Sequence, residues 1–242
     1  MLERLRYLLL QVRNSDDPMR RQEVQCFARA LGTKPEQIGV FDLLSRRLDA
    51  RDLEGVDMAL LGGSGHYWVS GEGEWLDRAL DSLRLLHGSR KPTFASCWGF
   101  QAMARALGGR VVKDLVRAEL GTHDVHLTPA GLADPVFGPL GQTFRGHMGH
   151  EDHVLELPVG TTRLAYSDRV ANQAYRFDDR PIYCTQFHPE LNRADLLERV
   201  QFYPEYIERI AGVPLEKFGD MIEETPETEL LLKRFVGTVF GT

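Results

Sequence analysis

Short apolar runs alternate with longer segments of helical period through the first half of the chain, and this rhythm constrains the fold more than any single motif. The run at Tyr7–Val12 has the length of a buried strand, and apolar side chains then recur every three or four positions until Gly32. The expected series continues with strands at 38–44 and 56–63, a helix at 73–88, a strand at 92–96 and a helix at 97–109. Such a βαβ order predicts an α/β fold with a mostly parallel central sheet and helices on both faces.

From about Gly121 the rhythm changes to short runs separated by turns. These predict strands at 122–128, 142–148, 153–158, 162–167, 172–177 and 181–187. We expect them to add antiparallel strands to the sheet, with the last run returning to its core. After Leu191, helical patterns resume at 194–212 and 227–240. The chain is therefore expected to consist of a domain at 1–191 and a helical C-terminal extension at 192–242, packed on the core or forming an interface such as that of a homodimer.

Composition and charge argue against several classes of protein. The 242 residues are 43% hydrophobic and 26% charged, which suits a globular chain that buries its own core. The net charge of −6, with no basic tract, disfavours binding of nucleic acid through phosphates. The first apolar run is interrupted by Arg6, closed by Arg13 and too short to span a membrane. Three cysteines without CxxC spacing (Cys26, Cys97 and Cys184) favour a reducing, cytoplasmic location.

Cys97 lies at the junction between a predicted strand and a predicted helix. Ala95 and Gly99 flank it with small side chains, as a sharp strand-to-helix turn requires. A helix N-terminus favours the thiolate form of a cysteine and offers backbone N–H groups to a developing oxyanion. Cys97 is therefore a candidate nucleophile, although a lone cysteine is more often a small buried core residue.

A second candidate segment follows the last predicted strand. Pro189 favours an extended conformation at His188, and alternation along an extended chain places His188 and Glu190 on the same side. A histidine oriented by a carboxylate is the base that a cysteine nucleophile needs. The alternative is a simple capped end of a strand.

Gly62, Gly63 and Gly65 form a third candidate segment, after the predicted strand at 56–63. Glycines allow a sharp turn that directs N–H groups at an anion, but for this segment taken alone a plain turn is the favoured interpretation. The segment is a poor match to a phosphate-binding loop, because no GK[ST] follows.

In this order, the segments GGSG, SCWGFQ, GHMGHEDHVLELP and FHPE resemble the motifs of the class I glutamine amidotransferase family. The family includes the amidotransferase domain of GMP synthase and the γ-glutamyl peptidases, and the resemblance covers about Tyr7–Leu191. It implies a flavodoxin-like amidotransferase fold, a catalytic domain at 1–191 and no cofactor. It also implies hydrolysis of the side-chain amide of glutamine or a γ-glutamyl compound through a γ-glutamyl thioester, with release of ammonia or an amine.

Carried over by position, the resemblance makes Cys97 the nucleophile, His188 the general base and acid, and Glu190 its orienting partner. It assigns the oxyanion hole to the backbone N–H groups of Gly63 and Trp98. The implied substrate contacts are Gly62, Gln101, Gly149, Glu151 and Asp152.

Several positions depart from the family pattern and bear on the substrate. Ser64 replaces a usual proline, Trp98 is bulkier than the usual aliphatic residue, and Ser96 stands where an aliphatic residue is usual. Phe100 replaces a histidine, and Gly149 replaces a serine or asparagine. The pocket is thus expected to suit a compound larger or smaller than free glutamine.

Other interpretations remain open at this stage. A metal cluster is conceivable, but the spacing of its candidate ligands matches no standard zinc pattern: His147, His150, Glu151, Asp152 and His153. No nucleotide-binding motif is present, so the chain either serves a separate synthase subunit or works alone as a hydrolase. A degenerate binding protein is a further alternative, against which the intact Cys97, His188 and Glu190 argue.

Overall fold

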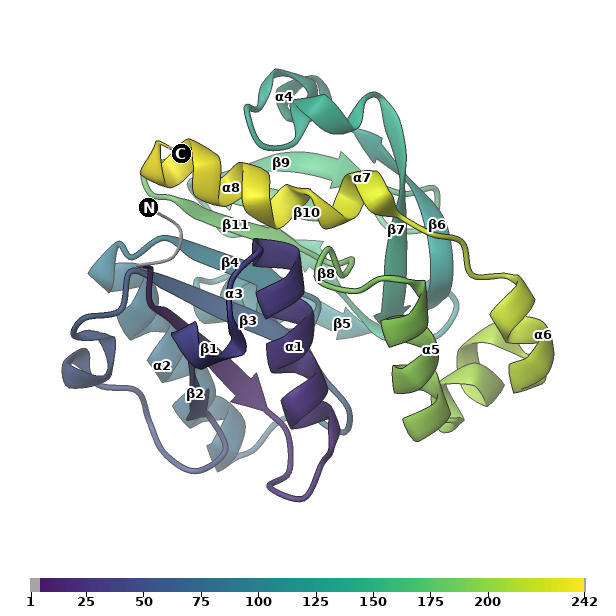
Figure 1. The fold of residues 1–242 in the computed structure, drawn as a ribbon, viewed down its shortest axis with the longest axis horizontal. Coiled ribbons are helices and arrows are strands. Elements are labelled where there is room, and N and C mark those ends of the chain that lie inside the picture. The colour runs from purple at the N-terminus through teal and green to yellow at the C-terminus, as the bar shows by residue number, and fades with distance from the viewer. Residues whose placement is uncertain (1–4, 242) are drawn as a thin grey trace.

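Eleven strands form two sheets within residues 5–241, the part of the chain that this computed structural model describes (Figure 1). The main sheet contains β1 (Tyr7–Val12), β2 (Ile38–Asp42), β3 (Met58–Ser64), β4 (Thr93–Ser96), β6 (Glu119–Leu127), β7 (Thr143–His150), β9 (Thr161–Tyr166), β10 (Ala174–Phe177) and β11 (Ile182–Thr185). Its spatial order is β2-β1-β3-β4-β11-β10-β9-β6-β7. A small second sheet pairs β5 (Arg110–Lys113) with β8 (Asp152–Glu156).

The two halves of the main sheet run differently. Strands β2, β1, β3, β4 and β11 are parallel neighbours, as the βαβ rhythm predicts. Strands β10, β9, β6 and β7 extend the sheet with antiparallel pairs, and β11 returns to the core beside β4. The strand expected at 153–158 forms as β8, but its expected place in the main sheet was wrong, because β8 lies in the second sheet. Only Glu151 separates β7 from β8, so the chain turns away there and pairs with β5, a strand that the sequence did not predict.

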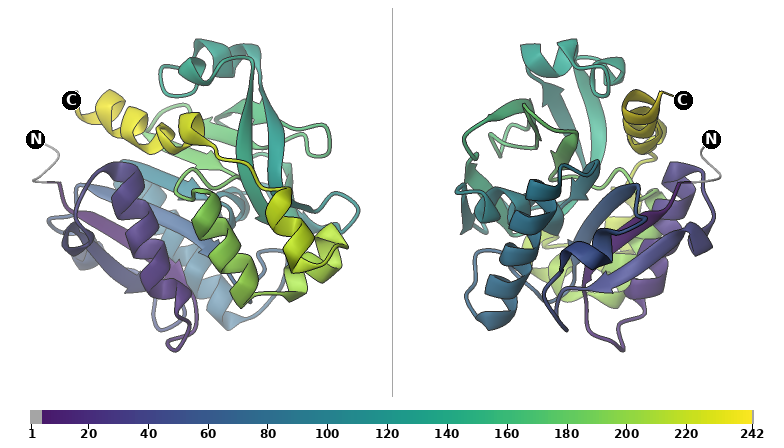
Figure 2. Two further views of the ribbon diagram at one scale, coloured as in Figure 1. Left: turned by 45° about the vertical axis from the view of Figure 1, so that its right-hand side comes forward. Right: turned by 90° about the vertical axis from the view of Figure 1, so that its left-hand side faces the viewer.

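Helices cover both faces of the sheet, as expected (Figures 1 and 2). Helices α1 (Met19–Leu31) and α8 (Leu231–Phe240) share one apolar cluster with the inner side chains of the sheet. Helices α2 (Glu74–Ser89) and α3 (Trp98–Ala106) form a second cluster on the opposite face. A short helix, α4 (Pro129–Ala133), lies against β9. None of the helices within residues 5–241 is both long and apolar enough to cross a membrane.

The C-terminal extension is helical, but its elements differ from the expected ones. Instead of one helix at 194–212, α5 (Arg193–Phe202) ends before Tyr203, and a π-helical turn follows at Ile207–Ala211. The reason is Pro204, which disfavours a helical conformation at the residue before it. The expected helix at 227–240 divides into α7 (Pro226–Glu229) and α8, and α6 (Leu215–Asp220) precedes them.

Helix α8 is part of the core of this chain. The ring of Phe235 makes edge contacts with Phe94 on β4, at a centroid distance of 5.6 Å, and with Tyr183 on β11, at 5.3 Å. We expect Phe235→Ala to lower the free energy of unfolding by about 3–5 kcal/mol, because it leaves a cavity under the sheet. Thr238→Ala, at an exposed position of the same helix, serves as the control and should change little. Urea unfolding distinguishes the two, and an equal effect would contradict this packing.

Candidate active site

The three candidate segments meet at one edge of the main sheet. Strands β3, β4 and β11 are parallel neighbours, with β4 in the centre. Cys97 directly follows β4, the glycine-rich segment lies at the carboxyl end of β3, and His188 comes shortly after β11. Since the carboxyl ends of parallel strands share one edge, the fold brings all three segments together, as the sequence predicts.

Cys97 has a strained backbone. Its φ of 51° and ψ of −104° are rare for a residue other than glycine. The conformation is held from both sides, because the Cys97 N–H donates to Thr185 O at 2.8 Å and the Gln101 N–H donates to Cys97 O at 3.1 Å. Two residues further on, position 99 requires glycine, since a Cβ on Gly99 would lie 2.5 Å from Leu61 Cβ. The side chain is buried, and its Sγ lies 3.7 Å from Gly149 O.

His188 and Glu190 form a buried pair. The Nδ1 atom of His188 lies 2.6 Å from Oε1 of Glu190. Burial opposes a charged His188, but the carboxylate of Glu190 and the nearby Cys97 outweigh it and raise the pKa of His188 from 6.5 to about 9. Burial likewise opposes a charged Glu190, yet His188 and Arg199 hold the pKa of Glu190 below its ordinary value. At neutral pH the pair is therefore an imidazolium beside a carboxylate.

The glycine-rich segment owes its composition to close packing. Gly62 and Gly63 lie within β3 and not in a turn after it. A Cβ at Gly62 would overlap the carboxylate of Glu23, and one at Gly63 would lie 3.0 Å from Cε1 of His188. Gly65 faces the ring of Tyr203 with no room for a side chain. These glycines let the catalytic histidine candidate and the C-terminal extension approach the sheet edge.

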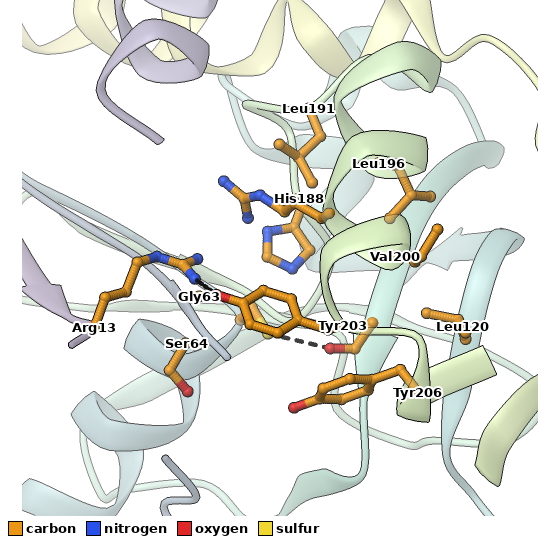
Figure 3. Close-up of a pocket in the computed structure, with 13 residues that line it drawn as sticks. Arg13, Gly63, Ser64, Leu120, His188, Leu191, Leu196, Val200, Tyr203 and Tyr206 are labelled. Atoms are coloured by element: carbon orange, nitrogen blue, oxygen red, sulfur yellow. Dashed lines mark hydrogen bonds between the residues drawn. The ribbon is translucent and has the colours of Figure 1, made fainter. Parts of the chain in front are cut away.

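Two hollows share Cys97, Ser64, Gly149 and Tyr206 in their linings. The first, here called the polar hollow, is completed by Tyr67, Trp68, Trp98, Gln101, His150, Glu151 and Asp152. The second, here called the apolar hollow, is completed by Arg13, Gly63, Leu120, His188, Leu191, Leu196, Arg199, Val200 and Tyr203 (Figure 3). Four of the five substrate contacts expected from sequence thus line the polar hollow. The fifth, Gly62, packs against Glu23 and lines neither hollow among the described residues.

The expected substrate contacts also make hydrogen bonds within the chain. Nε2 of Gln101 donates to Asp152 O at 2.8 Å and to the side chain of Gln186 at 3.1 Å. The carboxylate of Asp152 accepts from the N–H and hydroxyl of Ser70, at 2.7 and 2.8 Å. The buried carboxylate of Glu151 lies 2.7 Å from Nζ of Lys113 and 3.0 Å from Nη2 of Arg209. Gln101 and Asp152 therefore hold the walls of the polar hollow in place.

Comparison with known proteins identifies the family. A family model described as glutamine amidotransferase class-I matches residues 57–196, more than half of the chain. The chain belongs to the class-I glutamine amidotransferase family.

Similar proteins in this family include gamma-glutamyl peptidases and GMP synthases. Gamma-glutamyl peptidase 4 of Arabidopsis thaliana is 30% identical over 180 residues, which are 72% of this chain and 71% of that protein. The GMP synthase [glutamine-hydrolyzing] of Christiangramia forsetii is 31% identical over 161 residues, which are 66% of this chain but 30% of that protein. A solved glutamine amidotransferase from Thermotoga maritima superposes with a TM-score of 0.78 at 19% identity, covering 99% of this chain and 100% of that one. That last likeness establishes the shared fold.

The C-terminal extension contributes residues to the candidate site that the sequence analysis did not single out. Nη1 of Arg199, on α5, lies 3.7 Å from Oε1 of Glu190, and its Nε donates to Gln22 at 2.8 Å. Tyr203 accepts from Nη1 of Arg13 at 2.9 Å and donates to Asp17 at 2.5 Å. The available signal was the spacing of four residues between Arg199 and Tyr203 within the helix expected at 194–212, because such a spacing places both on one face.

The remaining histidines and cysteines have other partners. Nδ1 of His147 lies 3.2 Å from Oγ1 of Thr122, and His150 lies between Glu119 and Asp152 O. Within residues 5–241, no three His, Cys, Asp or Glu side chains come together as a metal site requires. Cys26 and Cys184 are buried free thiols, and burial raises the pKa of each to about 12. Both are thus protonated core residues.

Proposed function

We propose that this amidotransferase-family chain hydrolyses the side-chain amide of glutamine or of a γ-glutamyl compound by cysteine catalysis. Cys97 is the nucleophile, His188 the general base and acid, and Glu190 the residue that orients His188. The observation that supports this best is the strained backbone of Cys97 beside the buried His188–Glu190 pair. Strain of this kind persists where the surrounding structure enforces it, and it is typical of nucleophiles at strand-to-helix turns.

The proposed reaction has two halves. The Cys97 sulfur, having given its proton to His188, attacks the γ-carbonyl carbon, and the backbone N–H groups of Gly63 and Trp98 donate to the resulting oxyanion. The C–N bond then breaks as His188 gives its proton to the leaving nitrogen, and a γ-glutamyl thioester remains. Water, activated by His188, next hydrolyses the thioester to a γ-carboxylate and restores the thiol. The polar hollow with Gln101 and Glu151 holds the glutamyl end.

The same proposal makes the chain a self-sufficient hydrolase in which residues 192–242 extend the catalytic domain. Two observations support this. The apolar face of α8 is buried on this chain's own sheet. In a subunit that depends on a synthase, such a face could instead be exposed for the partner to cover. The gamma-glutamyl peptidases match over most of their own length, whereas the GMP synthase matches over 30% of its length. A separate synthase subunit is the alternative that this proposal replaces.

The decisive measurement is turnover by the pure chain alone. We expect release of glutamate, with ammonia from glutamine and a free amine from γ-glutamyl amides, and no requirement for a second protein. Ammonia and glutamate are assayed separately. A matched sample without protein measures the spontaneous deamidation that has to be subtracted. Activity that arises only after a synthase is added would favour the subunit alternative.

The pKa of His188 makes a prediction for the pH profile. The imidazolium is the proton donor, so kcat/KM should hold up to about pH 9 and fall above it, where His188 loses its proton. Glu190→Gln removes the negative charge that stabilises the imidazolium, which lowers the pKa of His188. The alkaline limb should therefore move to lower pH by roughly one unit or more. An alkaline limb that stays in place would contradict the assigned role of Glu190.

A further inference from the structure

The apolar hollow has a lining that hydrolysis of free glutamine does not need. Ammonia is small and polar, and it gains nothing from contact with hydrocarbon. Yet the hollow presents four aliphatic side chains and two aromatic rings next to Cys97, and all except Leu120 come from the segment after β11: Leu120, Leu191, Leu196, Val200, Tyr203 and Tyr206. Figure 3 shows these side chains gathered around His188.

We propose that the apolar hollow is the subsite for the leaving amine, and that the preferred substrates are γ-glutamyl amides of small apolar amines. This inference rests on the proposed function, and it names the substrate class of that same site. Leu196 and Val200 on α5 are its specificity-determining residues, because they form the wall that the alkyl group of the amine contacts.

The position of His188 decides which hollow takes the amine. In amide cleavage the acid must reach the leaving nitrogen, because the C–N bond breaks as that nitrogen takes the proton. Among the described residues, His188 lines the apolar hollow and is absent from the lining of the polar hollow. Trp98, Gln101 and Glu151 line the polar hollow instead. The scissile amide therefore places its glutamyl side in the polar hollow and its amine side in the apolar hollow.

The two buried arginines of the apolar hollow do not turn it into a carboxylate site. Arg13 is engaged by Glu23, with Nη2 at 3.2 Å from Oε1, and by the hydroxyl of Tyr203. Arg199 donates to Gln22 through Nε and lies near Glu190. Its Nη2 makes no hydrogen bond within the described chain, but it lies 3.9 Å from the carboxylate of Glu23. The positive charges are thus already balanced by buried carboxylates, and an apolar amine fits better than an amino acid.

The size of the hollow limits the amine. Its cavity volume is about 50 Å³, roughly a third of the ~150 Å³ apolar cavity that accommodates benzene. A space of that size favours a short alkyl group such as ethyl over a benzyl group. Tyr206 is held in place by its hydroxyl, which donates to Gly65 O at 3.0 Å.

The test compares γ-glutamylethylamide, glutamine and γ-glutamylglycine as substrates of the wild-type chain and of two matched variants. Leu196→Asn places an amide in the wall of the hollow. Leu197→Asn makes the same change at the neighbouring position of α5, which packs in the same apolar cluster outside both hollows. The readout is the ratio of kcat/KM for the ethylamide to that for glutamine, which cancels general effects on catalysis.

We expect Leu196→Asn to lower this ratio about tenfold or more, and Leu197→Asn to leave it unchanged. If Leu196→Asn does not fold, Val200→Thr replaces one methyl group by a hydroxyl of the same shape and gives the same test. An unchanged ratio in the folded variant, or a wild-type preference for γ-glutamylglycine, overturns the inference and leaves the amidase proposal intact. Absence of Cys97-dependent turnover of all three substrates overturns the amidase proposal itself.

Discussion

Replacing Cys97 by alanine is expected to lower kcat for amide hydrolysis by at least about 10³-fold while the chain stays folded. The Cys97 sulfur is the only protein atom that forms a covalent bond to the substrate in the proposed reaction, so no neighbouring group can replace it. Folding should be little affected, because the change removes only one sulfur atom, whose hydrogen bond to Gly149 O is long at 3.7 Å. Activity is measured as glutamate release, and folding by urea unfolding.

Cys97→Gly provides a second readout on the same residue. It should be as inactive as Cys97→Ala, but more stable than Cys97→Ala by about 1 kcal/mol, because glycine adopts a positive φ without strain. The matched control is Cys26→Ala, at a buried free cysteine on α1 outside both hollows among the described residues, which should keep full turnover. Retained turnover in Cys97→Ala would refute the proposed nucleophile.

The sequence predicted the parallel half of the sheet well, because buried strands and amphipathic helices leave periodic patterns of apolar residues. It also predicted that Cys97, His188 and the glycine-rich segment meet, since the carboxyl ends of neighbouring parallel strands share an edge. Strand β5 escaped prediction because Arg110–Lys113 is short and half-exposed, and its pairing with β8 depends on a turn at Glu151. The local pattern of apolar residues around 110–113 does not show that a strand about forty residues later in the chain, β8, will pair with this segment.

The role of the C-terminal extension was hidden for a related reason. Leu196, Val200 and Tyr203 look like the buried face of any amphipathic helix. Only the three-dimensional arrangement shows that this face lies over His188 and Cys97 instead of over the sheet. Gly65 was misread in the same way, because its lack of a side chain serves the ring of Tyr203, well over a hundred residues later in the chain. The candidate catalytic residues at the sheet edge and the residues that cover them thus come from separate parts of the sequence.

Replacing His188 by alanine or glutamine should lower kcat nearly as much as Cys97→Ala. In the proposed mechanism His188 both activates Cys97 and protonates the leaving nitrogen, so the acylation step loses both functions at once. The double variant Cys97→Ala/His188→Ala should be no slower than Cys97→Ala alone, because residues that act as a unit have non-additive effects. His126→Gln is the matched control, since His126 lies on β6, pairs with Thr143 and lines neither hollow among the described residues.

A thiol-reactive probe separates the two functions of His188. In the proposed mechanism His188 activates Cys97 as a nucleophile, so His188→Ala should slow alkylation of Cys97 by iodoacetamide at pH 7. The difference should shrink as the pH rises through about 9, because the wild-type imidazolium then loses its proton. Cys26 and Cys184 do not compete in this assay, since both thiols are buried and protonated in that range. Equal alkylation rates at pH 7 would remove His188 from the activation of the nucleophile, even if the variant were inactive.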